Sequence, residues 1–196
     1  NYTIFKNTDN TKPDIPLLIV GDINSNSYTN DIGKSIISSV IIGDLITDIC
    51  QNAFSDCHNL QSVTIPNKVE SLGNHAFADC ISMNQVIFDD ISNSNLISIE
   101  NACFRGCYSL TQIIIPSSVT TLSDNVFKDC HLLTDVSFHD ISNSNLINIG
   151  ISCFYDCSSL TQIIIPSSVT TIGASAFDGC SSLSSISIPH QVQEIS

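Results

Sequence analysis

Phenylalanine and cysteine recur along this chain at two alternating intervals, and this periodicity constrains the fold more than any other feature. Six Phe residues are separated by steps of 23, 27, 23, 27 and 23 residues, and a Cys follows each of them three positions later. Repeats of this length cannot bury an apolar side alone, so they stack and share one continuous core. The chain is therefore predicted to be a solenoid. The repeating pairs are Phe54/Cys57, Phe77/Cys80, Phe104/Cys107, Phe127/Cys130, Phe154/Cys157 and Phe177/Cys180.

A 27-residue and a 23-residue repeat together form a larger unit that is present twice. The segment 109–122 (SLTQIIIPSSVTTL) matches 159–172 (SLTQIIIPSSVTTI) at 13 of 14 positions. The segment 90–99 (DISNSNLISI) matches 140–149 (DISNSNLINI) at 9 of 10 positions. Agreement at this level indicates that the chain grew by internal duplication.

Each repeat combines one strand signature with one turn signature. The V-x-I portion alternates apolar and polar residues, as a half-buried strand does, and a Pro such as Pro66 or Pro116 stops the strand. The A-F-x-x-C portion spaces apolar residues by three, as one helical or 3₁₀ turn does. The predicted fold class is an α/β repeat: a solenoid with one strand per coil, a parallel sheet on one face, and short helical or 3₁₀ turns on the opposite face.

The repeat pattern divides the chain into two regions. Residues 37–196 fit the template, including an early copy at 37–49, and predict seven strands. Residues 1–36 depart from it, so we expect a partly irregular N-terminal cap in which 17–20 add one edge strand. The template is interrupted at Ser196, where the next G-x-x-A-F would begin, so further coils or a tail are expected beyond it.

This repeat resembles the BspA-like leucine-rich repeats, also called the Treponema pallidum type. The resemblance rests on the I-P-x-x-V-x-x-I-G step at 165–173 and the A-F-x-x-C step at 176–180, and it covers residues 37–196. It implies a leucine-rich-repeat solenoid and a surface protein, from a bacterium or a parasitic protist, that adheres to host matrix proteins and cells. The Asn- and Ile-rich composition favours a protist. Two repeats depart from the family pattern, because D-D-I-S-N-S-N or H-D-I-S-N-S-N replaces their Pro step.

The charge balance excludes several classes of partner. Six basic residues against nineteen acidic ones give a net charge of −13, whereas binding to nucleic acid or to an anionic membrane requires a Lys- and Arg-rich surface. The longest apolar run, 15–20, is too short to span a bilayer.

The five His residues are scattered, and no nucleophile elbow or phosphate-binding Gly loop is present. We therefore expect no enzyme activity, no cofactor and no direct membrane insertion of this segment.

The cysteines are interpreted as structural thiols. Six of them occupy one column of the solenoid, where a thiol behaves as a small buried hydrophobe. The total of nine is odd, and Cys103 and Cys153 replace an Ala of the template, which favours reduced thiols over disulfides. Zinc binding is disfavoured because the two i,i+4 Cys pairs lie two coils apart, about 10 Å. The predicted structural thiols are Cys57, Cys80, Cys107, Cys130, Cys157 and Cys180.

The outward side of the predicted sheet is the candidate binding surface. Side chains of a strand alternate between core and solvent, and this alternation places an apolar column of Ile outside, among Gln, Ser and Thr. The alternative interpretation is that Ile is there only because it favours strands. The two D-I-S-N-S-N loops border the sheet, and Asx turns are favoured over a calcium site in them. The predicted binding residues are Ile87, Gln112, Ile114, Gln162 and Ile164, with Asp89, Asp90 and Asp140 in the rim loops.

Three functions are compatible with these features. The first is a non-enzymatic adhesin at the cell surface that contacts host matrix or cell-surface proteins. Because the outward side of the predicted sheet lacks Trp, Tyr and Arg, we expect a weak affinity for each copy, raised by many copies on one surface. The alternative is a cytoplasmic scaffold or regulator, favoured by the nine cysteines and by a single glycosylation sequon at Asn1. The third is a structural spacer that carries a neighbouring domain. The ligand and the oligomeric state stay open.

Overall fold

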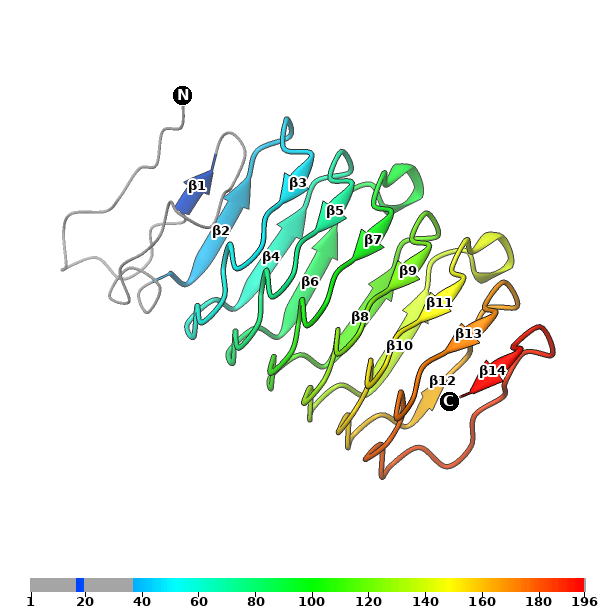
Figure 1. Cartoon of the computed structure of the whole chain (residues 1–196). Helices are drawn as coiled ribbons and strands as arrows, with labels where there is room; N and C mark the ends of the chain where they lie inside the picture. The colour runs from blue at the N-terminus through cyan, green and yellow to red at the C-terminus, as the bar shows by residue number, and fades with distance from the viewer. Residues whose placement is uncertain (1–16, 20–36, 196) are drawn as a thin grey trace.

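The computed structural model describes residues 17–19 and 37–195 and confirms the predicted solenoid. Its coils stack along one axis, and their strands pair in parallel from coil to coil (Figure 1). Strand β1 (Leu17–Ile19) pairs with the first strand of the solenoid in the register Leu17↔Val40, so an edge strand does lie within 17–20. The rest of the expected N-terminal cap falls outside the described residues.

Each coil contains two strands, which corrects the expectation of one strand per coil. A front strand forms at the V-x-I portion, and a back strand of two residues forms farther around the coil. The sequence pattern missed the back strands because two residues are too few to show an alternation. The front strands are β2 (Ser39–Ile42), β4 (Ser62–Ile65), β6 (Gln85–Phe88), β8 (Gln112–Ile115), β10 (Asp135–Phe138) and β12 (Gln162–Ile163). The back strands are β3 (Asp48–Ile49), β5 (Ser71–Leu72), β7 (Ser98–Ile99), β9 (Thr121–Leu122), β11 (Asn148–Ile149), β13 (Thr171–Ile172) and β14 (Glu194–Ile195).

The back strands form one continuous seven-stranded sheet, whereas the front strands are divided into two sheets. The front sheets have the orders β1-β2-β4-β6 and β12-β10-β8, and the division falls after the first 27-residue coil. After the second such coil, the ladder between β10 and β12 is reduced to the pairs Asp135↔Gln162 and Val136↔Ile163. The residues added to the long coils therefore interrupt the pairing of front strands and leave the back sheet intact.

The six A-F-x-x-C segments all lie in the described residues and form turns without a helix, which corrects the expected helical or 3₁₀ turns. Their backbone N–H groups alternate between two kinds of acceptor. The Ala53 N–H donates to Cys50 O within the coil at 3.2 Å, whereas the Phe54 N–H donates to Ala76 O of the next coil at 2.7 Å. A helix would keep both donors within the segment. In the described part of the chain, 3₁₀ helices occur at η2 (Ile91–Asn93) and η3 (Ile141–Asn143), in the inserted loops.

The side of the solenoid that these turns form, which we call the turn edge, has a left-handed backbone at two positions of each repeat. The residue before each column Cys has a φ between 56° and 76°. Asp and Gly tolerate this conformation better than most residues, Gly because it has no Cβ. The backbone therefore suits the Asp and Gly residues of this column, which occur twice in the order Asp, Asp, Gly. They are Asp56, Asp79, Gly106, Asp129, Asp156 and Gly179.

The core consists of side-chain columns that continue from coil to coil. The Phe rings from Phe54 to Phe177 form one stack, with neighbouring centroids 5.2 to 5.6 Å apart and ring planes within 11° of each other. Phe104, in the middle of this stack, has no exposed surface. Because each coil packs on its two neighbours through equivalent contacts, stability is close to a sum over coils and their interfaces.

Candidate functional site

The front face, which is the outward side of the front strands, carries the predicted apolar column. Ile87 pairs with Thr64 and Ile114 pairs with Ser137 in the strand register, so outward residues of successive coils are aligned. The side chains of Ile87, Ile114 and Ile164 are 41%, 50% and 68% exposed. The structure therefore places all three predicted Ile residues on one surface and in solvent.

Charged side chains are nearly absent from the front face. Asp135 is the one charged residue among the outward positions of β2, β4, β6, β8, β10 and β12. Gln112 and Gln162 are exposed and both pair with Asp135 in the register, so the two predicted Gln residues lie in a single column. In a chain with a net charge of −13, the acidic residues are therefore concentrated on the other sides of the solenoid.

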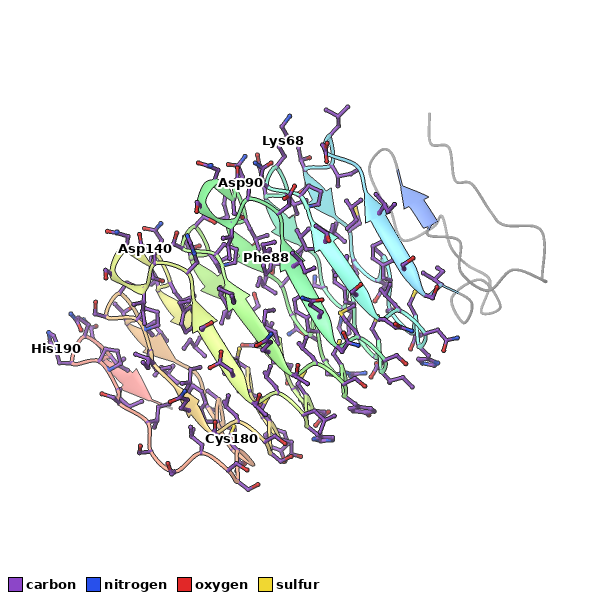
Figure 2. All side chains as sticks on the ribbon, turned by 180° about the vertical axis from the view of Figure 1, so that it is seen from behind. Lys68, Phe88, Asp90, Asp140, Cys180 and His190 are labelled. Atoms are coloured by element: carbon purple, nitrogen blue, oxygen red, sulfur yellow. The ribbon has the colours of Figure 1, made fainter. Side chains whose placement is uncertain are left out.

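The two inserted loops lie along one edge of the solenoid, where Figure 2 labels Asp90 and Asp140. Both residues are exposed and have a left-handed backbone, with φ of 45° and 44°. The side-chain amide of Asn93 donates to the Asp90 carboxylate at 3.0 Å, and that of Asn143 donates to Asp140 at 2.9 Å. Asp89, also exposed, continues the ladder of the preceding strand through its backbone N–H. The carboxylates of Asp90 and Asp140 thus stabilise the conformation of the loops in which they lie.

The two loops also contact each other across the shorter coil that separates them. Ser92 Oγ lies 3.3 Å from Nε2 of His139. Residues 37–195 contain no group of three or more His, Cys, Asp or Glu side chains arranged to hold a metal ion. Asp90 and Asp140 therefore occupy equivalent positions in the two rim loops.

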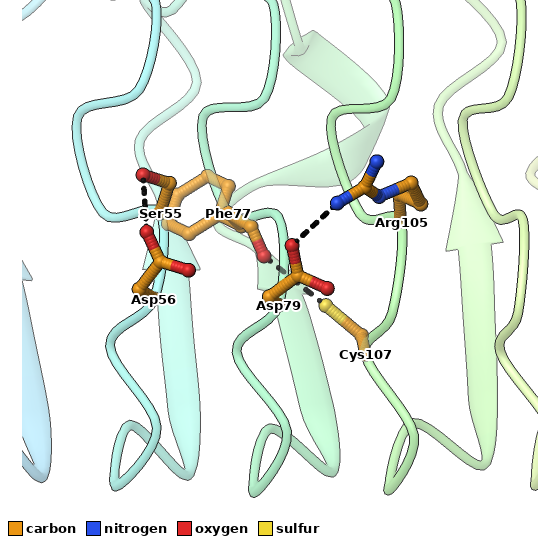
Figure 3. A network of polar contacts seen from close by, with 6 residues as sticks. All are labelled: Ser55, Asp56, Phe77, Asp79, Arg105 and Cys107. Atoms are coloured by element: carbon orange, nitrogen blue, oxygen red, sulfur yellow. Dashed lines mark hydrogen bonds and ion pairs between the residues drawn. The ribbon is translucent and has the colours of Figure 1, made fainter.

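The column cysteines lie in the core as thiols. The Sγ–H of Cys80 donates to Phe54 O at 3.1 Å, and that of Cys107 donates to Phe77 O at 3.3 Å (Figure 3). The same bond to the preceding coil recurs at 3.1 to 3.2 Å for Cys130, Cys157 and Cys180. Burial raises the pKa of these thiols, to about 11 for Cys180. The column consequently stays protonated and able to donate at neutral pH.

The turn edge carries aromatic and basic side chains that the sequence reasoning did not single out. Each of them interacts with a residue of a neighbouring coil. Their signal in the sequence is a set of large side chains at the outward positions of consecutive A-F-x-x-C segments. The pairs are Arg105–Asp79, with Nη2 and Oδ2 2.7 Å apart (Figure 3), Tyr108–His131, with ring centroids 5.4 Å apart, and Lys128–Tyr155, with Nζ 4.9 Å from the ring centroid.

A family model described as BspA type Leucine rich repeat region matches the chain in six copies, over residues 21–144 and 88–196. This match confirms the family expected from the I-P-x-x-V-x-x-I-G and A-F-x-x-C steps. No curated protein matches the sequence.

Solved structures of bacterial leucine-rich-repeat proteins have the same fold. A leucine rich cell surface protein from Faecalibacterium prausnitzii is 28% identical with a TM-score of 0.65, over 94% of this chain and 52% of that one. A leucine-rich repeat protein from Bacteroides ovatus is 20% identical with a TM-score of 0.55, over 98% of this chain and 52% of that one. The T. pallidum leucine rich repeat protein is 20% identical with a TM-score of 0.58, over 93% of this chain and 87% of that one. The chain thus spans about half the length of the first two, and these matches give no support to a protist origin.

A leucine-rich-repeat solenoid is typically a non-enzymatic scaffold that binds proteins. The described residues contain no helix that is both long and apolar enough to cross a membrane. The features described above fit a scaffold of this kind, because they form a rigid stack with an apolar, nearly uncharged face.

Proposed function

Because this chain belongs to the BspA-type leucine-rich-repeat family, we propose that it is a protein-binding module of a cell-surface adhesin and that it binds through the front face. The observation that carries the proposal is the column of half-exposed Ile on a face with a single charge. The description of the Faecalibacterium prausnitzii structure as a cell surface protein supports the location. Host matrix and cell-surface proteins are the proposed class of partner.

The internal duplication supports the choice of the front face. The segment 109–121, which includes the exposed residues Gln112 and Ile114, recurs without a change as 159–171. Exposed side chains are free of the packing constraints that preserve a core, so packing does not account for their identity in the two copies. The turn-edge segment 100–108 shares only its two Cys and one Phe with the second copy.

The magnitude of the apolar contribution indicates a weak interaction per copy. Full burial of an Ile side chain contributes roughly 1.5–3 kcal/mol, so a half-exposed one contributes about 1 kcal/mol. Three such residues do not offset an association cost of about 4–15 kcal/mol, and polar contacts must add to them. Many copies on one surface raise the overall avidity. The proposed contact residues are Ile87, Gln112, Ile114, Gln162 and Ile164, with Asp89, Asp90 and Asp140 at the rim.

The first experiment compares two substitutions at residues of equal exposure. Ile114 lies on the front face and Ile151 lies on the turn edge, and each is 50% exposed. Binding to immobilised fibronectin and fibrinogen is measured by surface plasmon resonance for the unchanged chain, for Ile114→Asp and for Ile151→Asp. We expect saturable binding that Ile114→Asp abolishes and Ile151→Asp retains. Equal binding by the two variants contradicts the assignment of the front face.

A second experiment tests the location. Antibodies against this domain are applied to intact and to permeabilised cells of the source organism. Labelling of intact cells supports a surface module. Labelling that appears only after permeabilisation contradicts it and favours the intracellular scaffold instead.

A further inference from the structure

The ion pair between Arg105 and Asp79 on the turn edge is built around a Gly of the left-handed column. Arg105 Nη2 lies 2.7 Å from Asp79 Oδ2 (Figure 3). A Cβ on Gly106 would meet the Asp79 carboxylate, so that carboxylate lies over the Gly of the next coil. The Asp79 N–H donates to Arg105 O at 2.7 Å. The residue before the Gly therefore provides both a backbone acceptor and a cation to the same Asp.

The same arrangement of Asp and Gly recurs farther along the turn edge, at Asp156 and Gly179. The Asp156 N–H donates to Asp178 O at 2.8 Å, and a Cβ on Gly179 would meet the Asp156 carboxylate. Both glycines have a left-handed backbone, with φ of 70° and 76°. The equivalent residues of the two arrangements are Asp79 and Asp156, Arg105 and Asp178, and Gly106 and Gly179.

The second arrangement has a carboxylate in place of the cation, because Asp178 stands where Arg105 stands in the first. Among residues 37–195, no Lys, Arg or His forms an ion pair with Asp156 or Asp178. The left-handed backbone suits an Asp at 156, whereas Asp178 has no positive φ and is exposed. Backbone geometry therefore does not account for the second carboxylate.

The second arrangement is also more open than the first. The side chains that follow the column Cys beside the first are Ile81 and Tyr108, which are large and 38% and 44% exposed. Those beside the second are Ser158 and Ser181. Ser158 Oγ donates to His131 O at 3.4 Å, and Ser181 Oγ donates to Ser158 O at 3.3 Å, so both short side chains are held against the turns. A group from outside the chain can therefore reach the carboxylates.

We propose that Asp156, Asp178 and Gly179, which we call the acidic notch, bind the guanidinium group of an arginine side chain from a partner protein. The first arrangement holds this same group on the equivalent carboxylate. A guanidinium presents a planar fork of donors that matches carboxylate geometry, whereas an ammonium is a compact and strongly hydrated point charge. The net charge of −13 also favours the approach of a basic partner.

The acidic notch lies on the turn edge, so it is separate from the front face and does not depend on the function proposed above. Its groups are exposed, and exposed ion pairs are weak and screened by salt. The notch therefore selects arginine at one position of a partner and supplies only a small part of the affinity.

The test adds N-acetyl-arginine amide to the isotope-labelled chain and follows its backbone amides by nuclear magnetic resonance. We expect a saturable shift of the Gly179 amide with a dissociation constant in the millimolar range, and at least about threefold weaker binding of N-acetyl-lysine amide. Equal affinity for the two probes shows attraction by charge alone and overturns the proposal. The absence of a saturable shift up to the solubility limit of the arginine probe overturns it as well.

Two variants exchange the residues that distinguish the arrangements. Asp178→Arg gives the acidic notch its own guanidinium, so the response of Gly179 to the arginine probe should disappear. Arg105→Asp removes the internal cation from Asp79, so a new response should appear at the Gly106 amide. A persistent response at Gly179 in the first variant, or none at Gly106 in the second, contradicts the equivalence and overturns the proposal.

Lys128→Asp is the matched control for Arg105→Asp, because it makes the same change of charge on the turn edge. Lys128 belongs to neither arrangement, since its Nζ lies over the Tyr155 ring. We expect this variant to retain the response at Gly179 and to gain none at Gly106. A response at Gly106 in Lys128→Asp shows that added negative charge alone attracts the probe, and overturns the proposal.

Discussion

Removal of one ring from the middle of the Phe stack tests how the solenoid is stabilised. Phe104 is fully buried, and its ring centroid lies 5.4 Å from that of Phe77 and 5.6 Å from that of Phe127. A Phe→Ala substitution in a core costs about 3–5 kcal/mol, and each aromatic pair contributes about 0.5–1.5 kcal/mol beyond its buried area. Since Phe104→Ala removes two pairs, we expect a loss near the upper limit, about 5 kcal/mol.

Phe177→Ala is the matched control in the last complete coil. Phe177 is only partly buried and has one neighbour in the stack, Phe154, at 5.3 Å. Phe177→Ala removes one aromatic pair and less buried area than Phe104→Ala does. We therefore expect about half the loss in the free energy of unfolding, roughly 2 kcal/mol.

Urea unfolding of both variants, followed by far-UV circular dichroism, measures these losses. A central defect also uncouples the coils on its two sides, so the transition of Phe104→Ala should broaden or split. Equal losses in the two variants, or a loss below about 1 kcal/mol for Phe104→Ala, refute the reasoning.

Three further predictions concern the thiols and the turn edge. In the native state an alkylating reagent should label Cys50, which is partly exposed, well before the buried cysteines; mass spectrometry after timed quenching checks this, and early labelling of Cys107 contradicts it. Burial raises the pKa of the column thiols, so the native state keeps protons that the unfolded state releases above about pH 8.5. The free energy of unfolding should therefore be undiminished below that pH. Above it, we expect the free energy of unfolding to fall by about 1.4 kcal/mol per pH unit for each thiol. The melting temperature from pH 7 to 10 measures this decline, which should be smaller in Cys107→Ala, and an equal decline in that variant argues against the cause. Gly106 has a φ of 70°, and a Cβ there would meet the Asp79 carboxylate; Gly106→Ala should therefore cost about 1–2 kcal/mol, and an unchanged urea midpoint is the contrary result.

The core and the front face were predictable because their signals repeat. Phe and Cys return at fixed steps, and the same residue type in the same place of every coil indicates burial. The exposure of Ile114 and Ile164 followed from the alternation of strand side chains, since one face of a strand that packs on a core must face solvent. Their role in binding stays a prediction.

The turns were interpreted wrongly because their backbone partners lie in other coils. A spacing of three apolar residues is typical of a helical turn, yet Phe54 N–H and every second donor bind the next coil instead. Hydrogen bonds between residues more than twenty positions apart have no signature in a short stretch of the sequence. The left-handed position before each column Cys did leave a trace in the sequence, because Asp79 and Gly106 occupy the same column and both residue types tolerate that conformation.

The exposed Ile residues that precede the back strands escaped prediction for a related reason. Ile97 and Ile147 precede strands of two residues, in a V-x-x-I step whose apolar members suggest only a core. The exposure of Ile97 and Ile147 becomes visible when equivalent residues are compared across coils and not along the chain. In a solenoid, the surface pattern is therefore found by comparing equivalent positions of successive coils.

The duplication also has a consequence for how such a molecule changes its length. Each two-coil unit contacts its neighbours through the same backbone register, as Asn148↔Thr171 repeats Ser98↔Thr121. Recombination between two such units inserts or removes one of them without creating a junction that is foreign to the fold. Each event changes the reach of the protein by about 10 Å and adds or deletes one complete set of its surface groups. Lineages can therefore adjust how far the domain extends, and how many identical contacts it offers, by gene rearrangement before any single residue is replaced.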